Sequence, residues 1–203
     1  MPYRTSLISR FEASISQVDE LLAIHYYLQT VPVAEVPDNI LRAALTMMVS
    51  AIDTSVHELI INGIMFEIKE SKSIFNLDKV KIGVLASRES DHDTRVRLIE
   101  SDLRRQFAKE SFQSSRQIET SLAQIGITKI WTKLSSMIGQ PPEDIKIKLD
   151  LLVRRRNQIV HEGDLDHLHS LRDIEREVLD ESLKFTKLLV NGMIDEFTKL
   201  VSV

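Results

Sequence analysis

Hydrophobic residues recur at steps of three and four along most of the chain, which is the spacing of an amphipathic α-helix. The first such segment covers residues 5–29, where a single apolar stripe consists of Leu7, Phe11, Ile15, Val18, Leu22 and Tyr26. Pro32 and Pro37 follow it, and proline lacks the backbone N–H that a helix interior needs. We therefore expect an N-terminal helix and a linker over residues 1–38.

The most apolar segment lies between about Ile40 and Lys69 and predicts a central, mostly buried helix. Its apolar positions recur at helical spacing on a wide face. Arg42, Asp53, His57 and Glu58 interrupt it, so the segment is a poor candidate for a lipid-spanning helix. The N-terminal residues contain no apolar stretch long enough for a signal peptide. We therefore expect no membrane contact and a cytoplasmic location.

The rest of the chain is also helical in pattern. Five further helices are expected, at residues 91–112 (opened by Asp91 or Asp93), 115–124, 128–137, 142–163 and 171–201. Residues 70–91 are the least decided part, since they fit either a short helix with a loop or a strand at Val80–Leu85. The expected fold is an all-α bundle of five to seven helices in a single domain, with the bundle over residues 39–203.

Composition narrows the possible chemistry. The chain of 203 residues is 43% hydrophobic and 28% charged, which is typical of a globular protein with a core. It has no cysteine, which excludes disulfides, thiolate zinc sites, iron–sulfur clusters and cysteine nucleophiles. The net charge of −4 excludes a surface that is basic throughout and binds nucleic acid all over, but it is compatible with a local basic patch. Neither a G-x-S-x-G motif nor a P-loop is present.

One short stretch carries the residue types of a catalytic site. Arg154, Arg155 and Arg156 stand together, Asn157 follows them, and His161 lies five residues after Arg156. A chain of this composition would contain about 0.01 Arg-Asn pairs followed by histidine at that spacing by chance. The stretch is expected at the end of a helix that stops at Gly163.

These residue types can cleave RNA without a metal ion. Arginine is permanently charged and binds phosphate with a planar fork. Histidine titrates near neutral pH and can move a proton. The histidine would remove the proton from the ribose 2′-OH, while arginine stabilises the charge that develops on the phosphate. Asn157 could orient the histidine or bind the phosphate.

The pattern R-N-x-x-x-H at residues 156–161 resembles the signature of the HEPN superfamily of all-α domains. The longer string RRRNQIVHEGDL is most similar to the RiboL-PSP-HEPN branch, and so is the upstream helix LRAALTMMVSAIDTSVHELI. The resemblance covers roughly residues 40–200. It implies a HEPN-like helical bundle that dimerises and brings two such motifs into one composite cleft.

The resemblance also implies an activity and a set of residue roles. Active members are metal-independent endoribonucleases that need no cofactor, and they often act as toxins or as effectors of anti-phage defence. By position, Arg156 corresponds to the phosphate-binding arginine, Asn157 to the adjoining polar residue and His161 to the catalytic histidine. Arg154 and Arg155 satisfy a looser form of the spacing and are expected to help bind the substrate. The implied partners are RNA, a second copy of the chain, and an antitoxin or another defence protein.

Two alternatives to an enzyme remain at this point. Some HEPN domains are non-catalytic, so the same dimer could bind RNA, a nucleotide or a partner protein without cleaving it. A weaker alternative is a structural dimer whose arginines pair with Asp53 and Glu58 across the helices.

Two further groups of polar residues need an interpretation. Asp53 and His57 lie one turn apart on an otherwise apolar helix, and burying them is costly unless they are paired. We expect them to face the arginine motif and support it, or else to form a satisfied pair in the core or lie at an exposed edge of the helix. The cluster Asp164, Asp166, His167 and His169 matches no strong metal-binding spacing and is expected to cap the start of the last helix.

Overall fold

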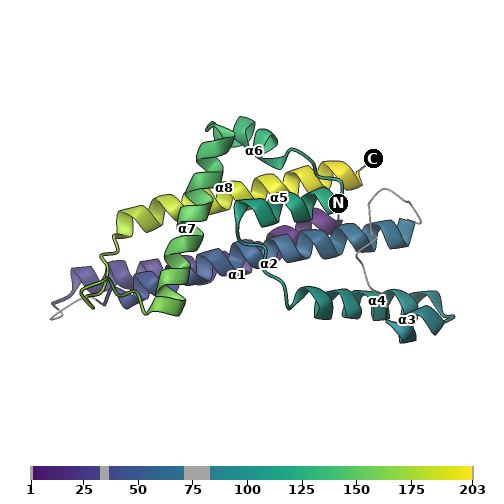
Figure 1. The fold of residues 1–203 in the computed structure, drawn as a ribbon, viewed down its shortest axis with the longest axis horizontal. Helices are drawn as coiled ribbons and strands as arrows, with labels where there is room; N and C mark the ends of the chain where they lie inside the picture. The colour runs from purple at the N-terminus through teal and green to yellow at the C-terminus, as the bar shows by residue number, and fades with distance from the viewer. Residues whose placement is uncertain (1, 33–36, 71–82, 203) are drawn as a thin grey trace.

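The structure, a computed structural model, describes residues 2–32, 37–70 and 83–202. This part of the chain contains eight α-helices and no β-strand (Figure 1). The helices are α1 (Pro2–Thr30), α2 (Asn39–Glu70), α3 (Val84–Arg88), α4 (His92–Phe107), α5 (Ser115–Gln124), α6 (Ile130–Ile138), α7 (Pro142–Glu162) and α8 (Arg176–Val201). The prediction of an all-α bundle is confirmed. The number of helices exceeds the expected range by one because α3 is a short helix of its own.

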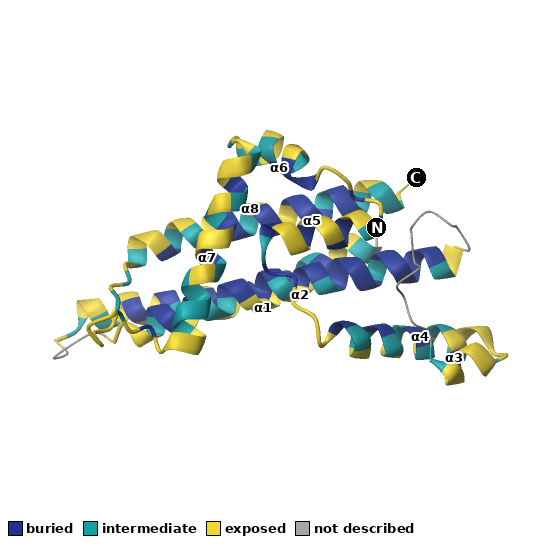
Figure 2. Cartoon of the chain, viewed as in Figure 1, coloured by how far each residue is buried: buried dark blue, intermediate teal, exposed yellow. Residues whose placement is uncertain are grey.

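Helix α2 is the centre of the fold, as its continuous apolar pattern predicts. It contacts α1, α4, α5, α7 and α8, and its buried residues occupy almost its whole length (Figure 2). By length and composition alone α2 could cross a membrane, but 67% of its most apolar window is buried inside the bundle. This burial confirms that α2 is a core helix of the bundle.

The long helices α1, α2 and α8 lie along the long axis of the molecule, and α7 runs across them (Figure 1). Helix α4 packs on the C-terminal half of α2, and α3 packs on α4. One hydrophobic cluster joins residues from α1 to α8, from Leu7 to Phe197. The exception on the stripe of α1 is Tyr26, which is 57% exposed and lies against Arg176, whose guanidinium carbon is 4.8 Å from the ring centroid.

Several helix boundaries differ from the expected ones for local reasons. Helix α4 ends at Phe107 and not at Phe112, because the chain turns so that both phenylalanines enter the core with ring centroids 6.0 Å apart. Helix α8 begins at Arg176 and not at residue 171, because residues 164–172 form a closed hairpin described below. The strand considered at Val80–Leu85 begins outside the described residues, and Val84 and Leu85 are helical.

Helix α2 approaches the end of α5 closely at Gly63. A β-carbon added to Gly63 would lie 2.9 Å from both Cβ and Cγ2 of Ile125, which is a fully buried side chain. We expect Gly63→Ala to lower the free energy of unfolding by about 1–2 kcal/mol, because overpacking outweighs the better helix propensity of alanine. Urea denaturation measures this, with the exposed position Ser50→Ala as the control. A stabilised Gly63→Ala protein would contradict this packing.

Candidate active site at the end of helix α7

Helix α7 holds the whole arginine–histidine motif on its last turns. The helix starts with Pro142 in its first turn and ends at Glu162. Gly163 caps it, with a φ of 65° that is a left-handed conformation which glycine adopts at no steric cost. The N–H groups of Gly163 and Asp164 both donate to the carbonyl oxygen of Gln158, which closes the C-terminus of the helix. His161 therefore lies in the last turn, where the negative end of the helix dipole favours a cationic side chain.

The spacing along α7 decides which motif residues share a face. Arg154, Asn157 and His161 follow one another at steps of three and four, so they lie on one side of the helix. Arg154 and His161 are exposed, and Asn157 is half-buried. Arg156 starts from a different side, about 140° around the helix from His161, but its Nη1 donates to Oδ1 of Asn157 at 3.0 Å. The Asn157 side chain thus links Arg156 to the face that carries His161.

Arg155 differs from its two neighbours because its side chain is bound within the protomer. Its guanidinium binds both carboxylate oxygens of Asp164, with Nη1 on Oδ1 and Nη2 at 3.0 Å from Oδ2, and Nη2 also donates to the carbonyl of Asp173 at 3.1 Å. Sequence reasoning assigned Arg155 to substrate binding together with Arg154. In the structure it is engaged inside the protomer, which leaves Arg154 and Arg156 as the available guanidinium groups of the motif.

Asp164 is the centre of a buried ion cluster that sequence reasoning missed. The residue is only 1% exposed, and Arg42 of α2 donates to its Oδ2 through Nε at 2.6 Å. Arg42 also donates to the carbonyl oxygen of Arg172 at 2.7 Å. A buried carboxylate is tolerated when cations and hydrogen bonds surround it, as here. The cluster fastens the segment after α7 to both α2 and α7.

Residues 164–172, which we call the leucine hairpin, follow directly from this cluster. Its ends are joined by a bond from Arg172 N–H to the Asp164 carbonyl at 2.9 Å and by an antiparallel bridge between Leu165 and Leu171. Asp166 accepts the N–H groups of Leu168 and Ser170 at 2.8 and 2.9 Å, so it stabilises the turn and not a helix start. The expectation that these aspartates cap the last helix is therefore corrected.

Among the residues that the structure describes, no group of three or more histidine, aspartate or glutamate side chains could hold a metal ion. His167 and His169 of the leucine hairpin are exposed.

An open cavity of about 480 Å³ lies beside the motif. Its walls are the first turn of α5, with Ser114, Ser115 and Arg116, and the face of α7 that carries Arg154 and Asn157. Asp150 fixes the two helices relative to each other, because it accepts from the N–H of Ser115 at 2.8 Å and from its hydroxyl at 2.7 Å. The site thus combines exposed cations with a hollow that could receive a ligand.

Asp53 and His57 lie elsewhere. Asp53 accepts the N–H of Phe112 at 2.6 Å, and the ring nitrogens of His57 are 2.8 and 3.0 Å from the carbonyl oxygens of Asp53 and Phe107. In the described part of the chain neither side chain bonds to the arginine motif, so that expectation is corrected. The alternative of a pair agrees with the structure, where His57 Nδ1 is 3.8 Å from Asp53 Oδ1 and both side chains bond to the connection between α4 and α5. This pair anchors that connection, which leads into Ser115 and the cavity.

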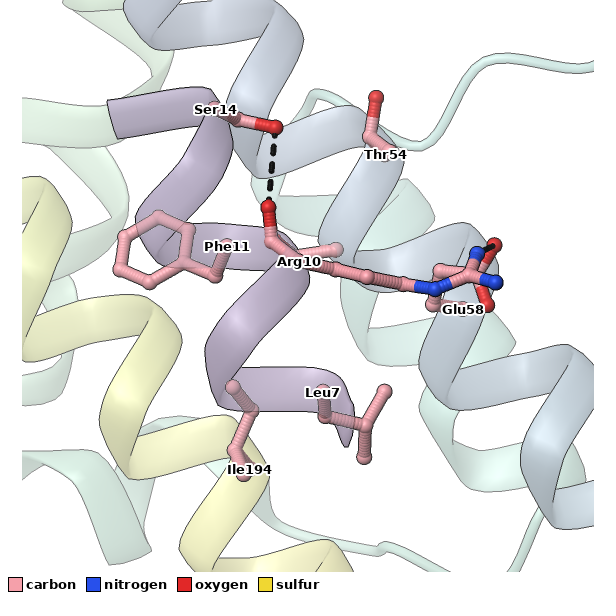
Figure 3. Close-up of a pocket in the computed structure, with 8 residues that line it drawn as sticks. Leu7, Arg10, Phe11, Ser14, Thr54, Glu58 and Ile194 are labelled. Carbon is pink, nitrogen blue, oxygen red and sulfur yellow. Dashed lines mark hydrogen bonds and ion pairs between the residues drawn. The ribbon is translucent and has the colours of Figure 1, made fainter. Parts of the chain in front are cut away.

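Glu58 is likewise engaged with other groups. Its Oε1 accepts from Arg10 of α1 and from Arg104 of α4, each at 2.6 Å, and Figure 3 shows Arg10 reaching it past a small pocket. The hydrogen bond to Glu58 raises the pKa of Arg104, with a smaller contribution from Glu100. Asp53 and Glu58 are therefore satisfied within the protomer, and neither pairs with the motif arginines as the structural alternative supposed.

One comparison with known proteins gave a match, to a family model. The family model described as RiboL-PSP-HEPN matches residues 12–199, which include α2 to α7 in full. Searches of curated proteins and of solved structures gave no significant match. Because the family model spans nearly the whole chain and the structure is an all-α bundle, the chain belongs to the RiboL-PSP-HEPN family of the HEPN superfamily.

Proposed function

We propose that this HEPN domain is a metal-independent endoribonuclease that acts as a homodimer. The observation that carries the proposal is the intact Arg156-Asn157…His161 motif at the exposed end of α7 in a chain of this family. His161 takes the proton from the ribose 2′-OH, and the 2′-oxygen attacks the adjacent phosphorus. Arg156, with Asn157 bound to it, stabilises the charge on the phosphate oxygens.

The second protomer completes the reaction. As the bond from the 2′-oxygen to phosphorus forms, the bond from phosphorus to the 5′-oxygen breaks, and the leaving oxygen needs a proton. His161 of the second copy supplies it. One α7 offers a single motif histidine, whereas the reaction uses one histidine as base and another as acid, which supports a cleft built from two copies. The products are a 2′,3′-cyclic phosphate and a 5′-hydroxyl.

The leucine hairpin supports the dimer, because it exposes apolar side chains right after His161. Leu165, Leu168 and Leu171 are 38%, 71% and 55% exposed, and a cluster of exposed leucines is typical of a contact surface. We expect Leu168→Asp to weaken the dimer at least about tenfold and to lower RNA cleavage with it. Analytical ultracentrifugation measures the first effect. Leu85→Asp is the control, since Leu85 is 75% exposed on α3. If the two variants dimerise with the same affinity, the leucine hairpin is not part of the interface.

Cleavage itself is tested with purified protein, labelled tRNA and total RNA in an excess of EDTA. The proposal predicts cleavage by the wild-type protein under these conditions. If the protein binds RNA tightly but cuts none of it, the chain is a binding module. The next step is then to identify its partner or activator. If cleavage stops when EDTA is added, the metal-independent mechanism is wrong.

The biological role that fits this activity is that of a toxin or an anti-phage effector in the cytoplasm, restrained by an antitoxin or another defence protein. Family membership supports it. Expression of the wild-type chain in a bacterium should then stop growth, whereas expression of the His161→Ala chain should not. Harmless wild-type expression of an enzyme that is active in vitro would argue against a toxin role.

A further inference from the structure

The cavity between α5 and α7 contains two arginines that are free of ion pairs. Most arginines of this chain bind a carboxylate, as Arg42, Arg104 and Arg155 do. Within the described ranges, Arg116 of α5 and Arg154 of α7 have no such partner, although they line the same cavity. A guanidinium carries five N–H donors in a planar fork, and here all of them are available to an anion.

The acidic groups of the same cavity are already engaged. Asp150 accepts two hydrogen bonds from Ser115, at 2.8 and 2.7 Å. Glu162, the other carboxylate of the lining, lies 4.0 Å from Arg172. The hydrogen bonds from Ser115 leave the charge of Asp150 in place, so the lining holds two cations and two carboxylates and carries no net charge. The guanidinium groups of Arg116 and Arg154 nevertheless have no carboxylate bound to them, so each can bind a phosphate group.

We propose that this cavity is an RNA-backbone groove, in which Arg116 and Arg154 bind phosphates of single-stranded RNA next to the cleavage site. The proposal rests on the proposed function and adds to it a binding residue, Arg116, outside the motif. The groove is continuous with the motif, because Asn157, which holds Arg156, is part of its wall. A strand that enters past Arg116 and Arg154 is delivered to Arg156 and His161.

The lining also indicates which part of the RNA is recognised. No aromatic side chain lines the groove, so it offers no platform on which bases could stack. Its open form suits a chain that passes through, and arginines that contact phosphate position a strand without reading its sequence. The groove therefore contributes affinity and register, and it leaves base preference to other contacts.

The test measures RNA binding by fluorescence anisotropy in the His161→Ala background, where RNA stays uncut. Adding Arg116→Ala is expected to raise the Kd for a single-stranded oligonucleotide about three- to tenfold and to reduce the slope of log K against log salt by about 0.7, the loss of one phosphate contact. Arg95→Ala is the matched control, because Arg95 is an exposed arginine of α4 away from the groove. Arg116→Lys should restore part of the affinity and the full salt slope.

In the active protein, Arg116→Ala should lower kcat/KM by the same factor and leave kcat at saturating RNA within about twofold, because uniform binding is lost and chemistry is not. If Arg116→Ala and Arg95→Ala give the same Kd for the oligonucleotide, the proposed RNA-backbone groove is wrong. Competition by a mononucleotide or by inorganic phosphate at concentrations near the Kd of the oligonucleotide would also overturn it, in favour of a small-ligand site.

The two proposals fail in different ways. If wild-type protein does not cleave RNA but Arg116→Ala weakens binding, the groove stands and the nuclease does not. If the protein cleaves RNA and Arg116→Ala changes neither Kd nor kcat/KM, the nuclease stands and the groove does not.

Discussion

Replacing His161 with alanine is expected to lower the rate of RNA cleavage by about 10²–10⁴ while the bundle stays folded. The side chain is exposed at the end of α7 and forms no hydrogen bond or ion pair with the described residues, so its removal costs little stability. Its imidazole is the proposed general base of the motif, so without it the attack of the 2′-OH loses its base. Single-turnover cleavage of a labelled RNA, with thermal melting alongside, measures both quantities.

The matched control is His92→Ala, another exposed histidine, at the start of α4. We expect it to keep wild-type cleavage within about twofold, since it is outside both the motif and the leucine hairpin. Arg156→Ala should lower the rate by about 10²–10³, as the loss of one group that stabilises transition-state charge does elsewhere. Cleavage by the His161→Ala protein at the wild-type rate would mean that another residue is the base.

Replacing Asp164 with alanine should lower the free energy of unfolding by about 3–5 kcal/mol, the cost of breaking a buried ion pair from one side. Arg42 and Arg155 would lose the carboxylate that both of them bind, and Arg42 is buried in the bundle. For a chain of this length the loss corresponds to a fall in Tm of roughly 6–20 °C. Urea denaturation and calorimetry measure these two quantities.

Asp173→Ala is the control for this prediction. Asp173 is exposed and lies just after the leucine hairpin, and its carbonyl, not its side chain, accepts from Arg155. Its replacement should change the free energy of unfolding by no more than about 0.5 kcal/mol. If the two variants unfold at the same urea concentration, the cluster around Asp164 does not hold the end of α7 in place.

The helical framework was predictable because apolar residues at steps of three and four follow directly from helix geometry. Helix α2 begins and ends within one residue of its expected bounds, and α5 covers its expected range. At the start of α5 a reciprocal capping box of Ser114 and Gln117 fixes the boundary. The start of α8 was misplaced because Ile174 and Val178 stand at helical spacing, although Ile174 precedes the helix and Val178 is exposed.

The motif could be found from sequence, but its surroundings could not. The pairing of Arg42 with Asp164 joins residues 122 positions apart, and periodicity shows which face of a helix is buried without showing what meets it. The same limit applies to Asp53, whose need for a partner was predicted while that partner, the Phe112 N–H, was not. Arg116 carried one signal that was overlooked, namely an arginine in the first turn of a capped helix with no acidic residue nearby in that turn.

The most direct test of the account is the chemical nature of the RNA ends produced in excess EDTA. Attack by the ribose 2′-OH predicts a 2′,3′-cyclic phosphate on one product and a 5′-hydroxyl on the other. Labelling with a 5′-kinase, which needs a free hydroxyl, and mass spectrometry of the 3′ end identify both. Products with 5′-phosphate and 3′-hydroxyl ends would mean that water and not the 2′-oxygen is the nucleophile, and they would contradict the mechanism proposed for Arg156, Asn157 and His161.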